Sequence, residues 1–317
     1  MCKNNVLVLT GIEDPMWPFL LDACSESQRD KIILFPTDMP QASQISMNPS
    51  SGELVFIINK RIIRASEIKS VWWRRIVVPQ MCFSDKGVEK YCSSEYLEFF
   101  AGLEYMMPDA LWVSLPSAIK RAENKVNQLR MAKSLGFIIP EGVFTNSPPM
   151  AKEFISIGRS IYKSVHSPRI LRENDKTASV FTTIIDQGNM QGIDGIVSCP
   201  GIFQKFCKKK SDIRVTIFGN DIFSVEIDSQ SDKSSAIDFR LTAADLPHLI
   251  HFLPDNISQK CFNLVSEMGL SYGAIDLVLM EDGSYVFFEI NPNGQWGWIE
   301  EKTQLPMRKS FLDLLFN

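Results

Sequence analysis

The sequence predicts a mixed α/β (α+β) fold, and two observations carry the prediction. Within the first 115 residues, short apolar strands alternate with helical segments, which is typical of a small α/β domain. Two hairpin signals follow in the last third of the chain, at residues 213–227 and 277–290, and they indicate an antiparallel sheet. A chain of 317 residues has room for two or three domains around a sizeable core.

The elements of the first domain follow from apolar runs and from the residues that end them. Strands are expected at 6–10, 31–35, 71–75 and 111–114, helices at 18–25 and 89–107, and a hairpin at 53–65. Prolines end several of these runs, because proline has no backbone N–H to donate. The strand at 71–75 ends in Arg74 and Arg75, which either hold an anion or form surface salt bridges.

The remaining elements follow from the same patterns. Helices are expected at 118–135, 148–157 and 257–268, and strands at 138–145, 159–165, 180–185 and 202–206, with the two hairpins after them. The polar segment 172–178 is interpreted as a loop, and 207–211 as a basic turn. These elements divide the chain into three expected domains, at 1–115, 116–201 and 202–317.

Composition and charge exclude several classes of function. The net charge is −4, so there is no global basic field to hold nucleic acid. The seven cysteines include no CxxC pair and suggest neither a disulfide framework nor a zinc ribbon, and a reducing cytoplasm fits them best. The start of the chain lacks a signal-peptide layout and no apolar run approaches transmembrane length, so no membrane partner is expected.

The last hairpin carries the strongest chemical signal. Asp282-Gly283 is a two-residue turn signal, and counting outward from it places Asp276 directly opposite Glu289. Asn291 lies two residues further along and therefore points to the same face. Paired carboxylates repel each other unless a cation lies between them, and two carboxylates with an amide suit magnesium. The alternative is a solvated hairpin face whose charges lie in water.

Magnesium held in this way usually also binds phosphate oxygens of a ligand. The sequence has no GxxxxGK[ST] loop, so the phosphates would have to meet basic side chains from separate elements. Four such side chains are available, at Lys125, Lys163, Arg214 and Arg240. Each of them alone is a weak signal, because an isolated lysine on an amphipathic element is most often a surface residue.

Several motifs occur in order along nearly the whole chain. They are Val71-Trp72-Trp73-Arg74-Arg75, Asn124-Lys125, Tyr162-Lys163, Gln204-Lys205-Phe206, Asp212-Ile213-Arg214, Ile237-Asp238-Phe239-Arg240, Tyr272-Gly273-Ala274-Ile275-Asp276, and the stretch from Glu289 to Glu300. In these motifs the chain resembles the ATP-grasp superfamily, and more closely its microviridin-type branch of ribosomal-peptide maturases, the graspetide synthetases. Gly294-Gln295-Trp296 is the most specific part.

The resemblance implies an ATP-grasp fold with an N-terminal α/β pre-ATP-grasp domain, a central domain and a C-terminal antiparallel-sheet domain. It implies contacts of Lys125 and Lys163 with ATP phosphates. It also implies an adenine-holding segment and a ribose contact, at Gln204, Lys205, Phe206 and Asp212. Arg214 and Arg240 would face the γ-phosphate and the acceptor carboxylate, and the Mg²⁺ ligands would be Asp276, Glu289 and Asn291. The segment 172–178 departs from the family, because it has no glycine where many ATP-grasp enzymes have a glycine-rich loop.

The implied activity is ATP-dependent ligation within a peptide. An Asp or Glu side chain of a ribosomal precursor peptide would be phosphorylated and then closed onto a Ser or Thr hydroxyl or a Lys amine, as a macrocyclic ω-ester or ω-amide. Two alternatives are another ATP-grasp carboxylate–amine ligase, acting on amino acids or a protein tail, and a non-catalytic nucleotide-binding protein. The intact set of Lys, Arg, Asp, Glu and Asn residues disfavours the last of these.

The expected partner is a precursor peptide with a leader and a core, and the resemblance also implies a homodimer. Because the chain is net acidic, leader recognition is expected to be local and partly apolar. The segments 208–210 and 169–176 are candidates for contact with an acidic core peptide. A solvated surface is the alternative for both segments.

Overall fold

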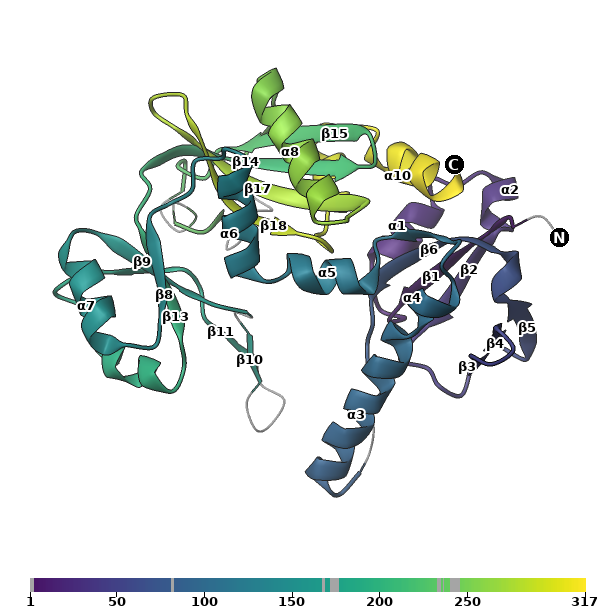
Figure 1. Ribbon diagram of the computed structural model, residues 1–317. Helices are drawn as coiled ribbons and strands as arrows, with labels where there is room; N and C mark the ends of the chain where they lie inside the picture. The colour runs from purple at the N-terminus through teal and green to yellow at the C-terminus, as the bar shows by residue number, and fades with distance from the viewer. Residues whose placement is uncertain are drawn as a thin grey trace.

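The fold is described from a computed structural model, and the structure describes residues 3–80, 83–166, 169–171, 177–232, 235, 237–239 and 246–317. Three groups of strands and helices are arranged around the centre of the molecule (Figure 1). The first part of the chain lies on the right of the view, the middle part on the left, and a large antiparallel sheet above and between them. The predicted mixed α/β class is confirmed.

The first part of the chain forms a parallel sheet in the order β2-β1-β6-β7. Its strands are β1 (Asn5–Thr10), β2 (Ile32–Pro36), β6 (Ile68–Arg75) and β7 (Leu111–Val113). Their alternating and continuous apolar residues are buried, as the sequence predicts for a sheet covered on both faces. Beside it lies an antiparallel sheet of β3 (Ser43–Asn48), β4 (Glu53–Ile58) and β5 (Arg61–Arg64). The strand β3 was not predicted, because its polar residues alternate with only two apolar ones.

The helices of the first half are shorter than predicted. The helix expected at 18–25 is α1 (Met16–Leu21) followed by α2 (Glu26–Arg29), and the helix expected at 89–107 is α3 (Lys86–Ala101) followed by α4 (Leu103–Met106). The helix expected at 118–135 is wrong as a single element, because it divides into α5 (Pro116–Ala122) and α6 (Lys125–Ser134). Asn124 causes the division: its side chain accepts the N–H of Asn127 at 3.0 Å and caps the second helix.

The middle of the chain forms an antiparallel sheet in the order β12-β9-β13-β8. Its strands are β8 (Gly142–Thr145), β9 (Ser160–Ser164), β12 (Thr183–Ile185) and β13 (Gly201–Lys205), and a separate hairpin joins β10 (Arg169–Leu171) to β11 (Thr177–Ser179). One face is covered by α7 (Pro148–Ser156) and by the 3₁₀ segment Ile193–Val197. Most of the loop predicted at 172–178 lies outside the described residues.

The last part of the chain forms a five-stranded sheet in the order β16-β15-β14-β17-β18. Its strands are β14 (Lys209–Phe218), β15 (Asp221–Ile227), β16 (His248–Ile250), β17 (Tyr272–Met280) and β18 (Tyr285–Asn291). Both predicted hairpins are confirmed. The helix α8 (Asp255–Glu267) packs on one face, and α9 (Gly297–Thr303) and α10 (Met307–Phe316), which the sequence patterns did not predict, follow the sheet.

A shared core joins the first sheet to the last helix. The Trp72 ring in β6 packs edge-on against Phe311 in α10, with 4.9 Å between the ring centroids. The hydroxyl of Ser70 donates to the carbonyl oxygen of Leu315 at 2.6 Å, and the ammonium of Lys69 donates to that of Phe316 at 2.6 Å. The boundaries at 115/116 and 201/202 stay predictions. No helix in the described part of the chain is both long enough and apolar enough to cross a membrane.

Candidate functional site

A cavity of about 930 Å³, part of it open to solvent, lies between the middle sheet and the five-stranded sheet. Eight of the eleven predicted site residues line it: Lys125, Lys163, Gln204, Lys205, Phe206, Asp212, Asp276 and Glu289. The charged lining residues that the structure describes are four lysines and four carboxylates. Without a bound cation, these charges balance and offer little attraction for a polyanion, so the cavity suits a polyanion that arrives with a metal.

The predicted pairing of Asp276 with Glu289 is confirmed, although the path to it is different. The turn is one residue longer than predicted, because the N–H of Met280 donates to the carbonyl of Ser284 and Leu279 pairs with Tyr285. A bulge at Phe288 then restores the predicted register. The longer turn shifts the strand register by one residue and the bulge shifts it back, so the two carboxylates face each other as predicted.

The outer strand of this hairpin is held from the side by Gln128 of α6, which is 4% exposed. Its amide nitrogen donates to the carbonyl of Ile290 at 2.9 Å, and its amide oxygen accepts the N–H of Ile290 at 3.2 Å. Ile290 lies between Glu289 and Asn291, so this bidentate contact fixes the backbone that carries both predicted metal ligands. It also satisfies an edge that would otherwise be open to another strand.

The residues at the hairpin fit a magnesium ion by their chemistry. Asp276 and Glu289 both line the cavity, and Asn291 follows on the same strand, opposite Ala274. Asn291 does not line the cavity, and its amide oxygen accepts the N–H of Asn293 at 3.0 Å. In the part of the chain that the structure describes, no cluster of three or more His, Cys, Asp or Glu residues could hold a metal. The set of two carboxylates and one amide suits a hard cation that keeps water or phosphate oxygens.

Arg214 lies in the buried wall behind the hairpin rather than on the cavity surface. One Nη atom lies 2.8 Å from Oδ1 of Asp276, and the other donates to the carbonyl of Gln295 at 3.3 Å. Burial lowers the pKa of this guanidinium, but the charge of Asp276 and its hydrogen bond act the other way, and the net shift is upward. Arg214 therefore stays charged and orients one of the predicted metal ligands.

Lys125 and Lys163 enter the cavity from different elements. The ammonium of Lys125, at the start of α6, donates to the carbonyl of Ser164 at 2.9 Å. The ammonium of Lys163, on β9, lies 4.8 Å from the centre of the Phe288 ring. The Lys125 ammonium thus contacts the end of β9, and the Lys163 ammonium lies beside a ring of the acidic hairpin.

The segment predicted to hold adenine runs from the end of β13 into the connection to β14. Gln204 is buried, whereas Lys205 and Phe206 are half-buried, and all three line the cavity. The Lys205 ammonium lies 5.2 Å from the centre of the Phe154 ring of α7, and the Arg159 guanidinium lies 4.5 Å from that of Phe206. A cation above the ring thus orients Phe206 as one wall of the cavity.

Sequence reasoning missed Lys209. The basic turn predicted at 207–211 is wrong, because β14 already begins at Lys209 and turns this side chain inward. Its ammonium lies 2.6 Å from Oδ2 of Asp212, and both side chains are almost completely buried in the cavity wall. Burial raises the pKa of Asp212, and the charge of Lys209 opposes that rise. Lys208 and Lys210 are exposed, which agrees with the alternative prediction that the segment 208–210 is a solvated surface.

The loop between β18 and α9 explains why the Gly294-Gln295-Trp296 motif has these residues. Three successive carbonyls, of Asn293, Gly294 and Gln295, accept hydrogen bonds from Arg74, Tyr272 and Arg214 in that order. A Cβ atom on Gly294 would lie 2.6 Å from the guanidinium of Arg214 and 2.8 Å from Cβ of Ala274, so only glycine fits. Trp296 is 1% exposed and packs against Phe19 and other rings of the shared core.

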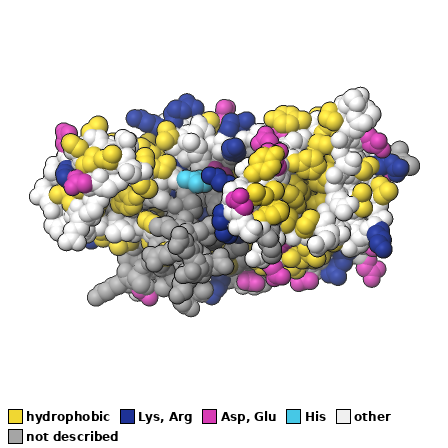
Figure 2. Space-filling view, turned by 90° about the horizontal axis from the view of Figure 1, so that it is seen from below, with side chains coloured by type: hydrophobic (Ala, Val, Ile, Leu, Met, Phe, Trp, Pro, Cys, Tyr) yellow, Lys and Arg dark blue, Asp and Glu magenta, His cyan; other side chains and the backbone are white. Residues whose placement is uncertain are grey.

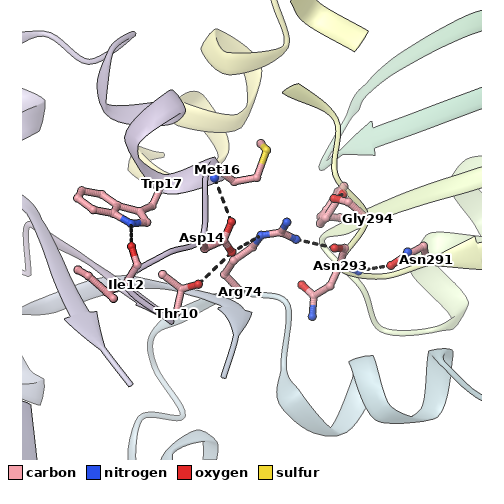
Figure 3. A network of polar contacts seen from close by, with 10 residues as sticks. Thr10, Ile12, Asp14, Met16, Trp17, Arg74, Asn291, Asn293 and Gly294 are labelled. Carbon is pink, nitrogen blue, oxygen red and sulfur yellow. Dashed lines mark hydrogen bonds and ion pairs between the residues drawn. The ribbon is translucent and has the colours of Figure 1, made fainter. Parts of the chain in front are cut away.

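Arg74 is not a surface residue, contrary to the salt-bridge interpretation of the sequence. It is 1% exposed, and its Nε atom lies 3.1 Å from the carboxylate of Asp14 (Figure 3).

Arg240, the second predicted catalytic arginine, lies outside the described residues, and so does most of the segment 169–176. In a view from below, Lys and Arg side chains gather near the middle of the face, and hydrophobic side chains gather over its right half (Figure 2).

Comparisons with known proteins agree with this geometry. No protein-family model and no curated protein matches the chain. Among solved structures, a RiPP-associated ATP-grasp ligase of Chryseobacterium gregarium, in complex with ADP and a leader and core peptide, is 26% identical, with a TM-score of 0.86 over 98% of this chain and 96% of that chain.

Two macrocyclases of Microcystis aeruginosa are also similar. MdnB is 27% identical with a TM-score of 0.79, and MdnC, bound with the precursor peptide MdnA, is 24% identical with a TM-score of 0.85. Each match covers 98% of this chain and 99% of the other. Together with the carboxylate pair, the lysine-lined cavity and the Gly-Gln-Trp loop, these matches show an ATP-grasp fold that is similar to RiPP-associated ATP-grasp ligases and macrocyclases.

Proposed function

We propose that this protein is an ATP-dependent ligase that closes side chains of a ribosomal precursor peptide into macrocyclic esters or amides. The observation that carries the proposal is the cavity in which a facing pair of carboxylates, Asp276 and Glu289, meets lysines from the opposite sheet. That arrangement binds a nucleotide triphosphate through a metal on one side and through direct cations on the other.

The roles proposed for the nucleotide-binding residues follow from their places. Lys125 and Lys163 contact phosphates, since both residues line the cavity that Asp276 and Glu289 also line. Gln204, Lys205 and Phe206 hold the adenine, because they form the connected segment at the cavity wall. Asp212 receives the ribose, and Lys209, 2.6 Å from its carboxylate, orients it for that contact.

We propose Asp276, Glu289 and Asn291 as the residues that hold magnesium, which when bound neutralises charge on the phosphate oxygens. Arg240 is proposed to stabilise the charge that develops on the transferred phosphoryl group and to position the acceptor carboxylate, and Arg214 to support that stabilisation from behind Asp276. The contact of Arg214 with Asp276 supports this role, because it places a permanent positive charge directly behind a metal ligand.

The proposed reaction has two steps. A carboxylate oxygen of the peptide attacks the γ-phosphorus of ATP, the bond to the β-phosphate oxygen breaks, and ADP leaves. A hydroxyl or amine of the same peptide then attacks the acyl carbon, loses its proton, and displaces phosphate. The peptide loses one water per ring in total. Positioning and charge neutralisation carry such chemistry, so the enzyme needs no nucleophile of its own.

The partner is proposed to be a precursor peptide with a leader and a core, and the assembly a homodimer. Exposed apolar side chains along α3, among them Tyr91 (64% exposed) and Phe99 (40% exposed), support self-association. We propose the cytoplasm as the compartment, because all five described cysteines are free thiols.

The decisive test is incubation of the purified protein with ATP, magnesium and the precursor peptide whose reading frame neighbours its own. The expected product is the peptide lighter by one water per ring, with release of ADP and phosphate that depends on the peptide. Nucleotide binding without peptide-dependent phosphate release would contradict the ligase proposal. Hydroxylamine trapping of the acyl phosphate, in a peptide whose hydroxyl and amine side chains are removed, separates the first step from the second.

A further inference from the structure

The loop between β18 and α9 is held by a side chain from the first sheet. Arg74 lies at the carboxyl end of β6 and donates to the carbonyl of Asn293 in that loop (Figure 3). The two residues are 219 positions apart in sequence. Arg74 is therefore the point where the first sheet contacts the backbone directly beyond the carboxylate hairpin.

The guanidinium is fixed in place by a carboxylate that is itself fixed. Asp14 accepts a hydrogen bond from the hydroxyl of Thr10 at 3.0 Å and another from the N–H of Met16 at 3.0 Å. Its remaining partner is Arg74, at 3.1 Å, and the two side chains are 4% and 1% exposed. Asp14 is therefore held by two hydrogen bonds and faces the guanidinium as a buried ion pair, and this charge contact sets where the Nη1 donor of Arg74 lies.

The contact reaches Asn291 through a single residue. Asn293 offers its carbonyl to Arg74, and its N–H donates to the side-chain oxygen of Asn291 at 3.0 Å. The series Asp14, Arg74, Asn293, Asn291 thus runs from the first sheet to the amide that is proposed to bind magnesium, as Figure 3 shows. The two contacts are on either side of the Asn293 Cα atom, so the backbone angles of this one residue set both of them.

We propose that Arg74 is a positioning residue for the metal site, which orients the amide oxygen of Asn291 through Asn293. The proposal rests on the magnesium role proposed above for Asn291. Partners that orient the ligands of a metal are typically worth about 10- to 100-fold in metal affinity. The first sheet thereby contributes to metal binding although none of its residues lines the cavity.

The test is a titration of magnesium chloride into the full-length protein with a fluorescent ADP analogue. Two variants remove the contact without leaving a buried charge alone. The double variant Arg74→Met with Asp14→Asn replaces the pair, because loss of the arginine only would strand a buried carboxylate. Arg74→Lys keeps a charge beside Asp14 but lacks the planar fork that reaches both partners.

We expect the half-saturating magnesium concentration to rise by about tenfold in Asn291→Ala and by about as much in both Arg74 variants. Binding of the analogue without metal stays as in the unaltered protein. In a variant that combines Asn291→Ala with the Arg74 and Asp14 changes, no further loss is expected, because both changes act through one ligand. A purely structural effect would instead lower metal-free binding and add to the loss in Asn291→Ala.

The matched control is Arg308→Met. Arg308 in α10 also joins the last part of the chain to the first, since it pairs with Glu300 of α9 at 2.6 Å and lies 4.4 Å from the Phe19 ring of α1. Unlike Arg74, it does not contact Asn293. Its magnesium titration should be unchanged. An unchanged titration in Asn291→Ala would overturn the metal role itself and this inference with it. A loss in Asn291→Ala, with none in the two Arg74 variants, would overturn the inference alone.

Discussion

The two sheets that border the cavity hold their charged groups in different ways. In the five-stranded sheet, Asp276 and Glu289 are set by strand pairing and by buried partners such as Arg214. On the opposite side, Lys163 reaches the cavity on a long side chain and rests over an aromatic ring. The core under the five-stranded sheet contains nineteen buried residues among those described, and the core under the middle sheet contains six.

This difference suits the two walls of the cavity to two functions, which are stabilisation of the transition state and binding of the nucleotide. Groups on a well-packed sheet keep their geometry to within small displacements, which transition-state stabilisation requires. Groups on flexible side chains over a small core adapt to the ligand and lose less when they are displaced. We call the side of the cavity with Asp276 and Glu289, backed by Arg214, the acidic wall, and the opposite side with Lys163 the lysine wall. We therefore expect changes in the acidic wall to affect turnover, and changes in the lysine wall to affect nucleotide affinity.

The largest effect is expected for Glu289→Gln. The change keeps the size of the side chain but removes one of the two facing charges, and a loss of about 4 kcal/mol of charge stabilisation corresponds to roughly a thousandfold lower kcat. Phosphate release with saturating peptide measures it. The control Glu281→Gln makes the same change in the exposed turn of the hairpin and should have no effect. Full activity of Glu289→Gln would remove the basis of the proposed site.

A smaller loss is expected for Arg214→Lys. Lysine retains the charge but cannot contact both Asp276 and the carbonyl of Gln295, as Arg214 does. We expect kcat to fall roughly a hundredfold, about 3 kcal/mol, with little change in the KM for ATP. Steady-state kinetics separates the two constants. If the KM for ATP rose while kcat stayed unchanged, Arg214 would act in nucleotide binding, as expected for the lysine wall. That result would contradict the proposed difference between the two walls at this residue.

Lys209→Met should lower stability in a way that depends on pH. Loss of one partner of a buried pair typically costs about 3 kcal/mol, because the other charge stays buried. Lys209 opposes the rise in the pKa of Asp212 above 3.8, so without it this folded-state pKa rises further. When the folded-state pKa of a carboxyl group lies above its unfolded value of 3.8, stability falls as pH rises from 3.8 to the folded-state pKa. The stability deficit of Lys209→Met relative to the unaltered protein is therefore largest at neutral pH and shrinks toward pH 3.8.

Urea unfolding at neutral and at acidic pH measures this deficit. The matched control is Lys210→Met, which alters the exposed neighbour on the same strand and should change stability little at either pH. A deficit of equal size at both pH values would show that lost packing, rather than the stranded charge of Asp212, is the cause.

The smallest effect is expected for Lys163→Met in the lysine wall. Removal of one charged contact to a phosphate costs about 1.5 kcal/mol, so the KM for ATP should rise roughly tenfold while kcat changes little. Lys152→Met, an exposed change in α7 of the same part of the molecule, serves as the control. A fall in kcat as large as that expected for Arg214→Lys would contradict the proposal that the lysine wall affects nucleotide affinity rather than turnover.

Much of the acidic wall could be predicted from the sequence, because a hairpin converts sequence spacing into spatial pairing. Even there, the turn was mispredicted by one residue and the bulge at Phe288 corrected the error by chance. Lys209 was missed because three consecutive lysines look like a solvated turn, and only the start of β14 buries the middle one.

The contact between Arg74 and Asp14 was out of reach for a different reason. The partner of a charged residue that lies 60 positions away in a loop leaves no periodic pattern, so burial of Arg74 could not be told from exposure. The single helix expected at 118–135 failed locally, because the tendency of Asn124 to cap a helix outweighed the propensity of its neighbours.

The packing of α10 on β6 has a consequence for synthesis of the chain. Trp72 leaves the ribosome long before Phe311, and at 5–20 residues per second the interval is roughly ten seconds or more. Throughout that time the buried face of the first sheet lacks the helix that covers it in the finished protein. The nascent chain therefore carries an apolar surface at β6 that stays uncovered until the last helix has been made.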